Sequence, residues 1–428
     1  MVFKIGRNAA QKAPGIFQKL FPGRTALIIA DQFTWPILGE RLSGYFRDAG
    51  IPVEAHREET FRAEWEDVER LDALLDTHPQ AILVAVGGGV INDLCKLCSY
   101  HHGQAYMTLP MAASVDGYAA FGASVTYEGT KQHFDCPQPA AMIADIDVLA
   151  SAPAAMSSSG YADLAAKIPA GGEWMVADCV GADPIQPEAW SILQDKLDEF
   201  LSRPAEVAAG NPDAIAAVFE GLTLSGVAMQ IAKSSRPASC CEHQFSHYLD
   251  MTGHRFEGRP VSHGFQVGIG TLAMCAVFDN LLQLDLTQLD VEACVQAWPS
   301  LEEEQERALK LFEDFPAPRL GYEEVTKKYQ DADAVRAQLT RLKANWPRLK
   351  EQLREQVYPY EKMYAMLRTA GAPCEPEQIG LTRQQLHDMF PRVQLMHYRY
   401  NLLDLARRGR FYDAIVEPLF APGGPFAL

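Results

Sequence analysis

The sequence predicts an α/β domain of the doubly wound type followed by an all-helical domain. Short apolar runs alternate with helical patterns in the N-terminal part, whereas almost every later segment has helical spacing. Between the two parts lies SAPAAMSSSG (151–160), a Pro- and Ser-rich stretch that interrupts the alternation. We therefore place the two domains at residues 1–156 and 157–428.

The first part alternates strands and helices along the chain. Apolar runs typical of buried parallel strands occupy 25–30, 51–55 and 81–86. Helical patterns at 35–49 and 65–77 separate these runs. The elements expected next are a helix from near Ile91, a small-residue loop at 108–114, and a strand at 123–131 with a hairpin back through Phe134. Residues 137–146 then lead into another apolar segment, AMIADIDVL.

The second part is expected to contain helices and few strands. The predicted helices are 161–177, 190–201, 212–232, 265–286, 301–312, 322–328, 333–357, 360–369, 382–389 and 393–408. The charge-dense region 301–356 is interpreted as solvated helix faces, with dimer or lid contacts as the alternative.

Composition and charge limit the class of protein. The 428 residues are 48% hydrophobic and 22% charged, which is typical of a soluble globular protein. The formal net charge of −17 argues against a nucleic-acid partner or an anionic membrane surface, because both need a basic patch. We expect no signal peptide and no membrane insertion, since no segment reaches roughly 18 uninterrupted apolar residues. The nine scattered cysteines are consistent with a cytoplasmic protein.

A glycine run connects the third predicted strand to the following helix. Gly87, Gly88 and Gly89 directly follow the apolar run AILVAV. Glycine lets the backbone approach a bulky anion, and the free amides at a helix start donate hydrogen bonds to it. The run is therefore a candidate site for the pyrophosphate of a dinucleotide. The alternative is a tight strand-to-helix turn without a ligand, since the run lacks the GxGxxG pattern.

Four of the eleven histidines lie in the stretch 236–270. His243 and His247 are four residues apart, so both rings lie on one face if the segment is helical. His263 follows a loop that contains Gly and Pro. Neutral imidazole is a common ligand of divalent metals, so the stretch is a candidate metal site. The alternative is a set of solvated or capping histidines, and His254 is interpreted as a loop histidine.

Six motifs occur in the order GGGVINDLCK, ASVDG, SGYADLAAK, SRPAS-CCEHQFSH, SHGFQVGIG and RYNLLDLA. Together they resemble the sn-glycerol-1-phosphate dehydrogenase family. This family belongs to a wider group with glycerol dehydrogenase, the iron-type alcohol dehydrogenases and dehydroquinate synthase. The likeness spans 5–406, and a helical insertion at about 301–380 makes this chain longer than the compact members.

The resemblance implies the architecture of the iron-type alcohol dehydrogenases and dehydroquinate synthase, with a nucleotide-binding α/β domain and a helical metal- and substrate-binding domain. The family's metal ligands fall on Asp163, His243 and His263. Its substrate-side, catalytic residues fall on His247 and Asp116. Its cofactor-binding residues fall on Gly87, Gly88, Gly89, Asp93, Lys96, Met111 and Ser114. The implied cofactors are NAD or NADP and one divalent ion (zinc, nickel or iron), and the implied assembly is a homodimer.

The reaction implied by the resemblance is reversible hydride transfer between NAD(P)H and a polyol or ketose phosphate, in particular sn-glycerol 1-phosphate and dihydroxyacetone phosphate. The alternatives are a dehydrogenase for glycerol or another alcohol, a dehydroquinate synthase-like lyase, and a non-catalytic binding protein derived from the family. Arg236 and Lys233 are candidates for contact with a substrate phosphate, and a structural role for Arg236 is equally open.

Two further expectations concern the site. The serines of SSSG supply N-cap residues, which would place Asp163 in the first turn of a helix. This chain also departs from the family pattern, and the departures leave its substrate open. They are Met111, Ala120, Cys240, Cys241 and Phe265.

Overall fold

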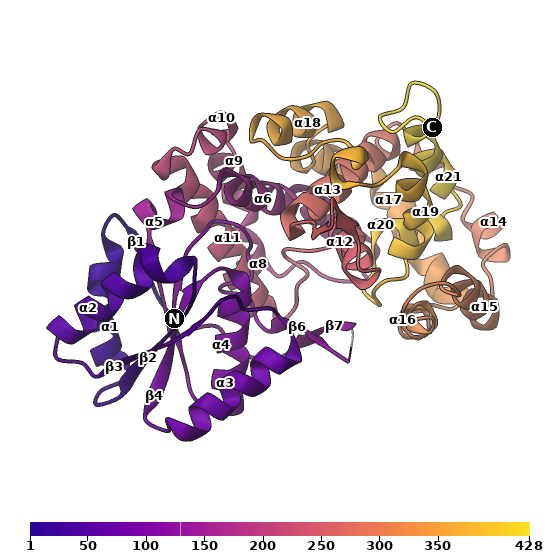
Figure 1. Cartoon of the computed structure of the whole chain (residues 1–428). Helices are drawn as coiled ribbons and strands as arrows, with labels where there is room; N and C mark the ends of the chain where they lie inside the picture. The colour runs from indigo at the N-terminus through magenta and orange to yellow at the C-terminus, as the bar shows by residue number, and fades with distance from the viewer. Residues whose placement is uncertain (129) are drawn as a thin grey trace. The chain divides into compact units, whose positions relative to one another are not determined.

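The computed structural model describes residues 1–128 and 130–428 (Figure 1). The chain forms two compact units. The first is Met1–Leu164 with Asp198–Ser234, and the second is Ala165–Leu197 with Ser235–Leu428. This division differs from the predicted boundary after residue 156, because a later segment returns to the first unit. In that segment, α11 (Pro212–Ala232) packs against α5 (Ile146–Ala150).

A six-stranded sheet of order β1-β8-β5-β4-β2-β3 forms the centre of the first unit, and all its strands are parallel. The strands are β1 (Val2–Gly6), β2 (Thr25–Asp31), β3 (Val53–Glu58), β4 (Ala81–Gly87), β5 (Met107–Pro110) and β8 (Ala141–Asp145). Every residue of β4 is buried, as expected where helices cover both faces of a parallel sheet. The α/β prediction for the N-terminal part is confirmed.

Helices lie on both faces of this sheet. They are η1 (Ala9–Lys12), α1 (Ala13–Leu20), η2 (Trp35–Gly39), α2 (Glu40–Asp48), α3 (Trp65–Thr77) and α4 (Gly89–His101). Phe17 and Phe46 join α1 and α2 to one core cluster, and Leu71 and Leu94 join α3 and α4 to a second. Figure 1 shows the two helix pairs on opposite sides of the strands. The predicted helix 65–77 is confirmed.

Three elements of the first unit differ from the predictions. The sequence pattern does not predict β1, because this edge strand is partly exposed and lacks a continuous apolar run. β5 occupies part of the predicted loop 108–114, because pairing with β4 and β8 buries its residues. The predicted strand 123–131 is an antiparallel pair, β6 (Ala123–Tyr127) and β7 (Thr130–Phe134), and residue 129 lies outside the described residues.

The stretch that was expected to separate the domains is helical. α6 (Ala154–Ala165) runs through SSSG, and Asp163 lies in its last turn instead of the first turn of a helix. Pro153 directly precedes α6, at a position where a missing backbone N–H is tolerated. Ser158 Oγ donates a hydrogen bond to the carbonyl of Ala154 at 3.1 Å, so this serine bonds within the helix and does not cap it.

The second unit is mostly helical, as predicted, with one short ribbon of β9 (Arg255–Phe256) and β10 (Arg259–Pro260) among its described residues. Its longer helices are α7 (Lys167–Val180), α12 (Cys241–Met251), α13 (His263–Leu281), α15 (Leu301–Leu311), α16 (Leu320–Lys328), α17 (Ala332–Gln356), α18 (Tyr360–Thr369) and α19 (Arg383–Val393). α13 contacts α7, α12, α18 and α21 and is therefore the central helix of the unit.

Short helices complete the two units. They are α8 (Pro187–Ser191), η3 (Gln194–Lys196), α9 (Leu197–Phe200), α10 (Pro204–Ala208), η4 (Leu286–Gln288), α14 (Val291–Gln296), η5 (Pro376–Ile379), α20 (Leu402–Arg408), α21 (Tyr412–Val416) and η6 (Glu417–Leu419). The predicted helix 393–408 is thus shorter, because a capping box of Asn401 and Asp404 starts α20 at Leu402.

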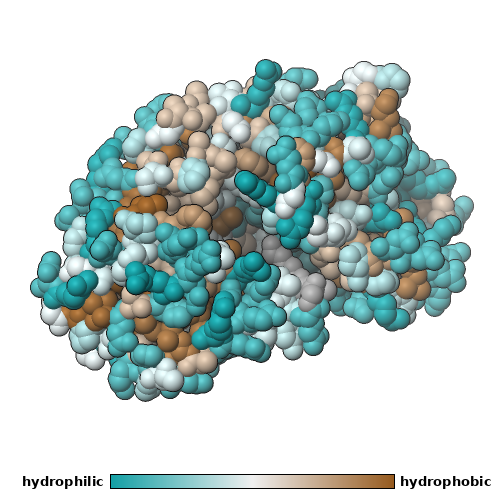
Figure 2. Space-filling view, viewed as in Figure 1, coloured by the Kyte–Doolittle hydropathy of each residue, from teal (hydrophilic) through white to brown (hydrophobic). Residues whose placement is uncertain are grey.

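α11 and α13 are long and apolar enough to cross a membrane by length and composition. However, 67% of the most apolar window of α11 and 83% of that of α13 are buried inside the protein. Burial of most of each helix explains its apolar composition, and both match core helices packed inside a protein. The face of the molecule in Figure 2 is largely hydrophilic, with hydrophobic residues scattered over it.

Candidate active site

The glycine run forms a tight turn from β4 into α4. A Cβ atom on Gly87 would lie 2.5 Å from Cδ1 of Ile91, so the first glycine is needed for packing of the helix against the strand. Gly88 has no neighbour within 4 Å of a Cβ position, so its surface is open to a ligand. Gly89 begins α4, whose first amides have no partner within the helix. The turn therefore has the backbone features that a pyrophosphate needs.

Lys96 holds the loop that follows β5. Its ammonium donates hydrogen bonds to the carbonyls of Gly117, Ala120 and Gly122 at 2.9, 3.0 and 2.9 Å. These bonds use all three donors of a fully buried side chain. Lys96 was predicted to bind the cofactor, and these three bonds give it a structural role in the loop as well.

The other predicted cofactor residues lie on the same side of the α/β unit. Asp93 accepts a hydrogen bond from the amide of Ser124 at 3.2 Å. Met111 donates its amide to the carbonyl of Gly87 at 3.1 Å, which ties the end of β5 to the glycine turn. Met111 and Ser114 are both buried. The structure therefore brings the backbone of Met111 to the glycine run.

Two of the predicted site carboxylates lie together in the first unit. The amide of Asp116 donates to Oδ2 of Asp163 at 3.1 Å, and Ser225 Oγ donates to Oδ2 of Asp116 at 2.9 Å. Asp163 is completely buried. α6, which carries it, ends at Ala165, and α7 of the second unit begins at Lys167.

His243 lies on α12 and is oriented by its neighbour in the sequence. Its Nδ1 lies 2.9 Å from Oε1 of the fully buried Glu242. A carboxylate can only accept, so Nδ1 carries the proton and Nε2 carries the lone pair. Nζ of Lys167 lies 3.5 Å from this Nε2 atom. His243 therefore presents an unprotonated nitrogen, which is the form that binds a metal ion.

His263 is the first residue of α13, and Ser246 on α12 fixes its tautomer. Ser246 Oγ donates its proton to Oε1 of Gln266 at 2.7 Å. The hydroxyl oxygen then accepts from Nδ1 of His263 at 3.0 Å, so Nε2 of this ring also carries a lone pair. The amide of Gln266 is held in this orientation by its bond to the carbonyl of Val261 at 3.3 Å. The centroids of the two histidine rings are 5.4 Å apart.

The predicted ligand set has the chemistry of a catalytic metal site. His243 and His263, both in the second unit, supply the two imidazoles of the predicted ligand set, and Asp163 in the first unit supplies its carboxylate. One carboxylate and two imidazoles suit zinc, nickel or ferrous iron. Three protein ligands leave a coordination position open for a substrate.

Comparison with known proteins agrees with this chemistry. The sequence pattern of the iron-containing alcohol dehydrogenases matches residues 4–153. Glycerol-1-phosphate dehydrogenase [NAD(P)+] of Bacillus licheniformis is 30% identical over 296 residues, which cover 68% of this chain and 74% of that protein. The Pyrococcus furiosus protein of the same name is 32% identical over 273 residues, or 63% and 76% of the two chains. The chain belongs to the glycerol-1-phosphate dehydrogenase family.

Solved structures show the same fold as this glycerol-1-phosphate dehydrogenase family member. Glycerol dehydrogenase from Schizosaccharomyces pombe has a TM-score of 0.60 at 15% identity, over 97% of this chain and 88% of that chain. Sulfoacetaldehyde reductase from Bifidobacterium kashiwanohense, in complex with NAD+, has a TM-score of 0.60 at 15% identity, over 97% of each chain. The predicted architecture and the predicted family are both confirmed.

The remaining residues of the histidine stretch have different environments in this family member. His247 lies one turn after His243 on α12 and is exposed, whereas His243 is buried. His254 donates from Nε2 to the carbonyl of Ile379 at 2.6 Å, which agrees with a loop histidine. Arg236 is buried and donates to the carbonyls of Tyr400 and Glu173 at 2.8 and 3.0 Å. These bonds support a structural role for Arg236 over contact with a substrate phosphate.

Sequence reasoning missed the residues that position the ligands. Glu173 on α7 accepts from the amide of Cys241 at 3.0 Å and from the amide of Leu402 at 2.7 Å, so it fixes the start of the histidine helix. Burial, and next the nearby Glu242 carboxylate, raise the pKa of Glu173 to about 7. Glu242 and Ser246 are visible in the motif EHQFSH, but no local pattern connects Glu173 with it.

Proposed function

We propose that this protein catalyses NAD(P)-dependent interconversion of sn-glycerol 1-phosphate and dihydroxyacetone phosphate. The observation that carries the proposal is the pair His243 and His263, whose Nδ1 atoms are held by Glu242 and Ser246, in a chain of the glycerol-1-phosphate dehydrogenase family. Relatives with that name are NAD(P)+ enzymes.

In this proposal, Asp163, His243 and His263 hold one divalent ion, either zinc, nickel or ferrous iron. Such an ion acts as a Lewis acid toward a ketone oxygen. The carboxylate of Glu242 and the hydroxyl of Ser246 keep the two rings in the ligating tautomer. Hydrogen-bond partners of this kind commonly determine both the orientation and the basicity of metal-binding histidines.

The dinucleotide is proposed to bind with its pyrophosphate at Gly87, Gly88 and Gly89 and the start of α4. Met111 and Ser114 border it from the loop after β5, and Asp93 supports the adjoining β6 strand through Ser124. The nicotinamide supplies the hydride, and the protein supplies its orientation. Lys96 contributes by holding the loop from Gly117 to Gly122.

Proton transfer is proposed to use His247. Its ring is exposed, one helical turn beyond the buried His243, and imidazole titrates near neutral pH. Asp116 is also a candidate, through a water that it holds. Its Oδ2 already accepts from Ser225 and its amide is bonded to Asp163, which supports a positioning role for this residue.

The proposed setting is a cytoplasmic homodimer that acts on a small phosphorylated substrate and binds no nucleic acid. All nine cysteines are free thiols, as a reducing compartment would require, and the net charge of −17 disfavours polyanionic partners. Light scattering coupled to size-exclusion chromatography tests the dimer.

The function is tested by following NADH and NADPH oxidation under anaerobic conditions, after chelation and reloading with each metal. Dihydroxyacetone phosphate, dihydroxyacetone and other ketoses are offered separately. We expect oxidation with dihydroxyacetone phosphate that His243→Ala abolishes and His254→Ala retains. Activity only with unphosphorylated substrates would instead assign a glycerol or alcohol dehydrogenase. Full activity of the His243→Ala protein would refute the metal-site assignment.

A further inference from the structure

The second unit contains a cavity of about 300 Å³ between α14, the end of α20 and the start of α21. This volume is at the lower end of the range for small-molecule pockets. Trp298, Arg407, Arg410, Tyr412 and Asp413 are among the residues that line it. None of them belongs to the metal or dinucleotide site described above.

Two hydrogen-bond donors in this lining have no acceptor among the described residues. They are Nε of Arg407 and the hydroxyl of Tyr412, and both atoms are buried. Burial is the main cause of a raised Tyr412 pKa, so the hydroxyl keeps its proton and remains a donor at neutral pH. A buried donor without an acceptor is unfavourable, and buried polar groups in proteins are normally paired.

Two of the residues that line the cavity, Arg407 and Arg410, are cationic, although the chain as a whole carries −17. Glu304 lies between two guanidinium groups, with Arg407 Nη2 at 2.5 Å and Arg307 Nη2 at 3.0 Å. One carboxylate therefore balances only one of these two arginines. Arg410 adds a third positive charge at the cavity, and Asp413 adds one negative charge there.

Arg410 occupies an unusual backbone position. Its φ angle is 57°, in the left-handed region that favours glycine, two residues after α20 ends. Glycine would adopt this conformation without strain, so the arginine side chain is retained at a small conformational penalty. Arg410 is exposed and lines the cavity.

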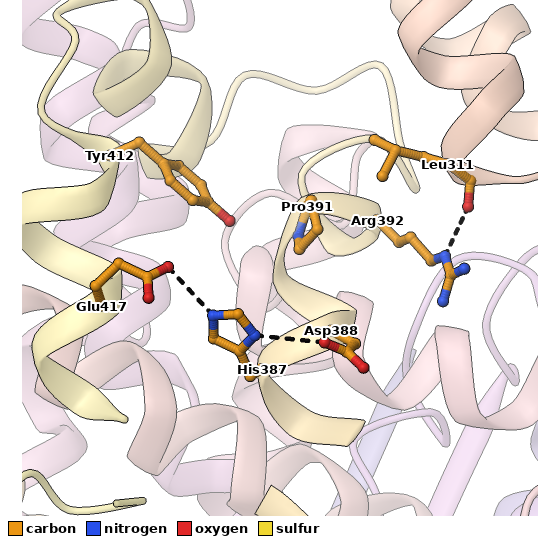
Figure 3. Close-up of a pocket in the computed structure, with 7 residues that line it drawn as sticks. All are labelled: Leu311, His387, Asp388, Pro391, Arg392, Tyr412 and Glu417. Atoms are coloured by element: carbon orange, nitrogen blue, oxygen red, sulfur yellow. Dashed lines mark hydrogen bonds and ion pairs between the residues drawn. The ribbon is translucent and has the colours of Figure 1, made fainter. Parts of the chain in front are cut away.

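A neighbouring cavity of about 350 Å³ provides a contrast (Figure 3). Its polar groups already bond to one another or to the backbone. His387 lies 3.1 Å from Oε1 of Glu417 and 3.4 Å from Oδ1 of Asp388, and Arg392 donates to the carbonyl of Leu311 at 2.7 Å. Tyr412 also borders this cavity, and in Figure 3 no dashed line reaches its hydroxyl. Nε of Arg407, which has no acceptor among the described residues, and the guanidinium of Arg410 therefore distinguish the first cavity.

We propose that the cavity beside the end of α20 binds a phosphoryl group, with Arg407, Arg410 and Tyr412 as its hydrogen-bond donors. A phosphate offers several acceptor oxygens and negative charge, which match two guanidinium groups and one hydroxyl. Trp298 forms an apolar wall, since its indole N–H already donates to the carbonyl of Gln330 at 2.8 Å. Free phosphate and a phosphate ester share this chemistry.

The first test is isothermal titration of the full-length protein with inorganic phosphate and, separately, with phenyl phosphate, against sodium chloride of equal ionic strength. Arg410→Gln and Tyr412→Phe alter the cavity, and Arg319→Gln is the matched control, because it removes one exposed arginine elsewhere in the same unit. We expect the affinity of one phosphate site to fall at least about tenfold in Arg410→Gln and about threefold in Tyr412→Phe. The control should retain the wild-type affinity. Tighter binding of phenyl phosphate than of phosphate would identify an ester as the preferred ligand, and equal binding would identify the free anion.

The second test locates the anion directly. Crystals soaked in selenate should give an anomalous difference peak within hydrogen-bond distance of Arg407 and Tyr412, and the peak should be absent from Arg410→Gln crystals. Unchanged isotherms in both cavity variants, or selenate sites only elsewhere, would overturn the proposal. Neither result depends on dehydrogenase activity, so the outcome is independent of the function proposed above.

Discussion

Nδ1 of His243 donates to Oε1 of Glu242 at 2.9 Å, and the side chain of Glu242 is completely buried. Replacing this carboxylate by a carboxamide weakens the acceptor and lowers the basicity of the imidazole. We expect Glu242→Gln to reduce affinity for the metal ion by roughly 10- to 100-fold, measured by competition with a chelator. The exposed Glu306→Gln variant is the control. Equal affinity in the two variants would show that Glu242 does not orient the ligand.

Ser246 links His263 to Gln266. Ser246→Ala would leave Nδ1 of His263 and Oε1 of Gln266 without their shared partner in a largely buried site. We expect the free energy of unfolding of the metal-free protein to fall by about 1–3 kcal/mol, measured by denaturant titration. Metal affinity should fall as well, because the ring can then adopt the other tautomer. A loss of stability with unchanged metal affinity would contradict the orienting role.

His247 is proposed to transfer the proton and not to bind the metal. We expect His247→Gln to lower kcat by about 10²- to 10⁴-fold while metal affinity stays at the wild-type value. His254→Gln is the control on the same segment, because its ring only bonds the carbonyl of Ile379. Weaker metal binding in His247→Gln, comparable to that of His243→Ala, would make His247 a ligand instead.

Glu173 should make the stability of the metal-free protein depend on pH. Its pKa is raised from 4.5 to about 7, so the folded state keeps a proton that the unfolded chain releases. The folded state then binds more protons, and the free energy of unfolding falls as the pH rises from 4.5 to about 7. In Glu173→Gln this fall should be smaller, measured by denaturant titrations across that range. An identical slope in wild type and variant would argue against the raised pKa.

Lys96 is expected to contribute more to folding stability than to cofactor binding. Lys96→Met removes the donor for three carbonyls in the loop from Gly117 to Gly122. We expect a loss of about 3 kcal/mol or more in the free energy of unfolding and faster amide exchange in that loop. The exposed Lys19→Met variant should be neutral. A stable Lys96→Met protein with only weaker NADH binding would instead support direct contact with the pyrophosphate.

The sequence by itself determined the elements whose signal is local. The buried strands of 25–30 and 81–86 and the helix 65–77 follow from continuous apolar runs and helical spacing, which depend on neighbouring residues alone. The glycine run and the HxxxH pair were equally visible, because a turn and a helix face are properties of a few adjacent positions. Family motifs added Asp163, which no local pattern distinguishes from other aspartates.

Only the tertiary structure decided how these groups are supported. β1 is an edge strand that pairs with β8, although the two strands are far apart in the sequence. α11 follows α7 in the sequence but belongs to the first unit, whereas α7 belongs to the second. The ammonium of Lys96 bonds three loop carbonyls, and Glu173 reaches the start of α12 from 68 residues away. Hydrogen bonds between distant segments depend on three-dimensional proximity, which leaves no periodic trace in the sequence.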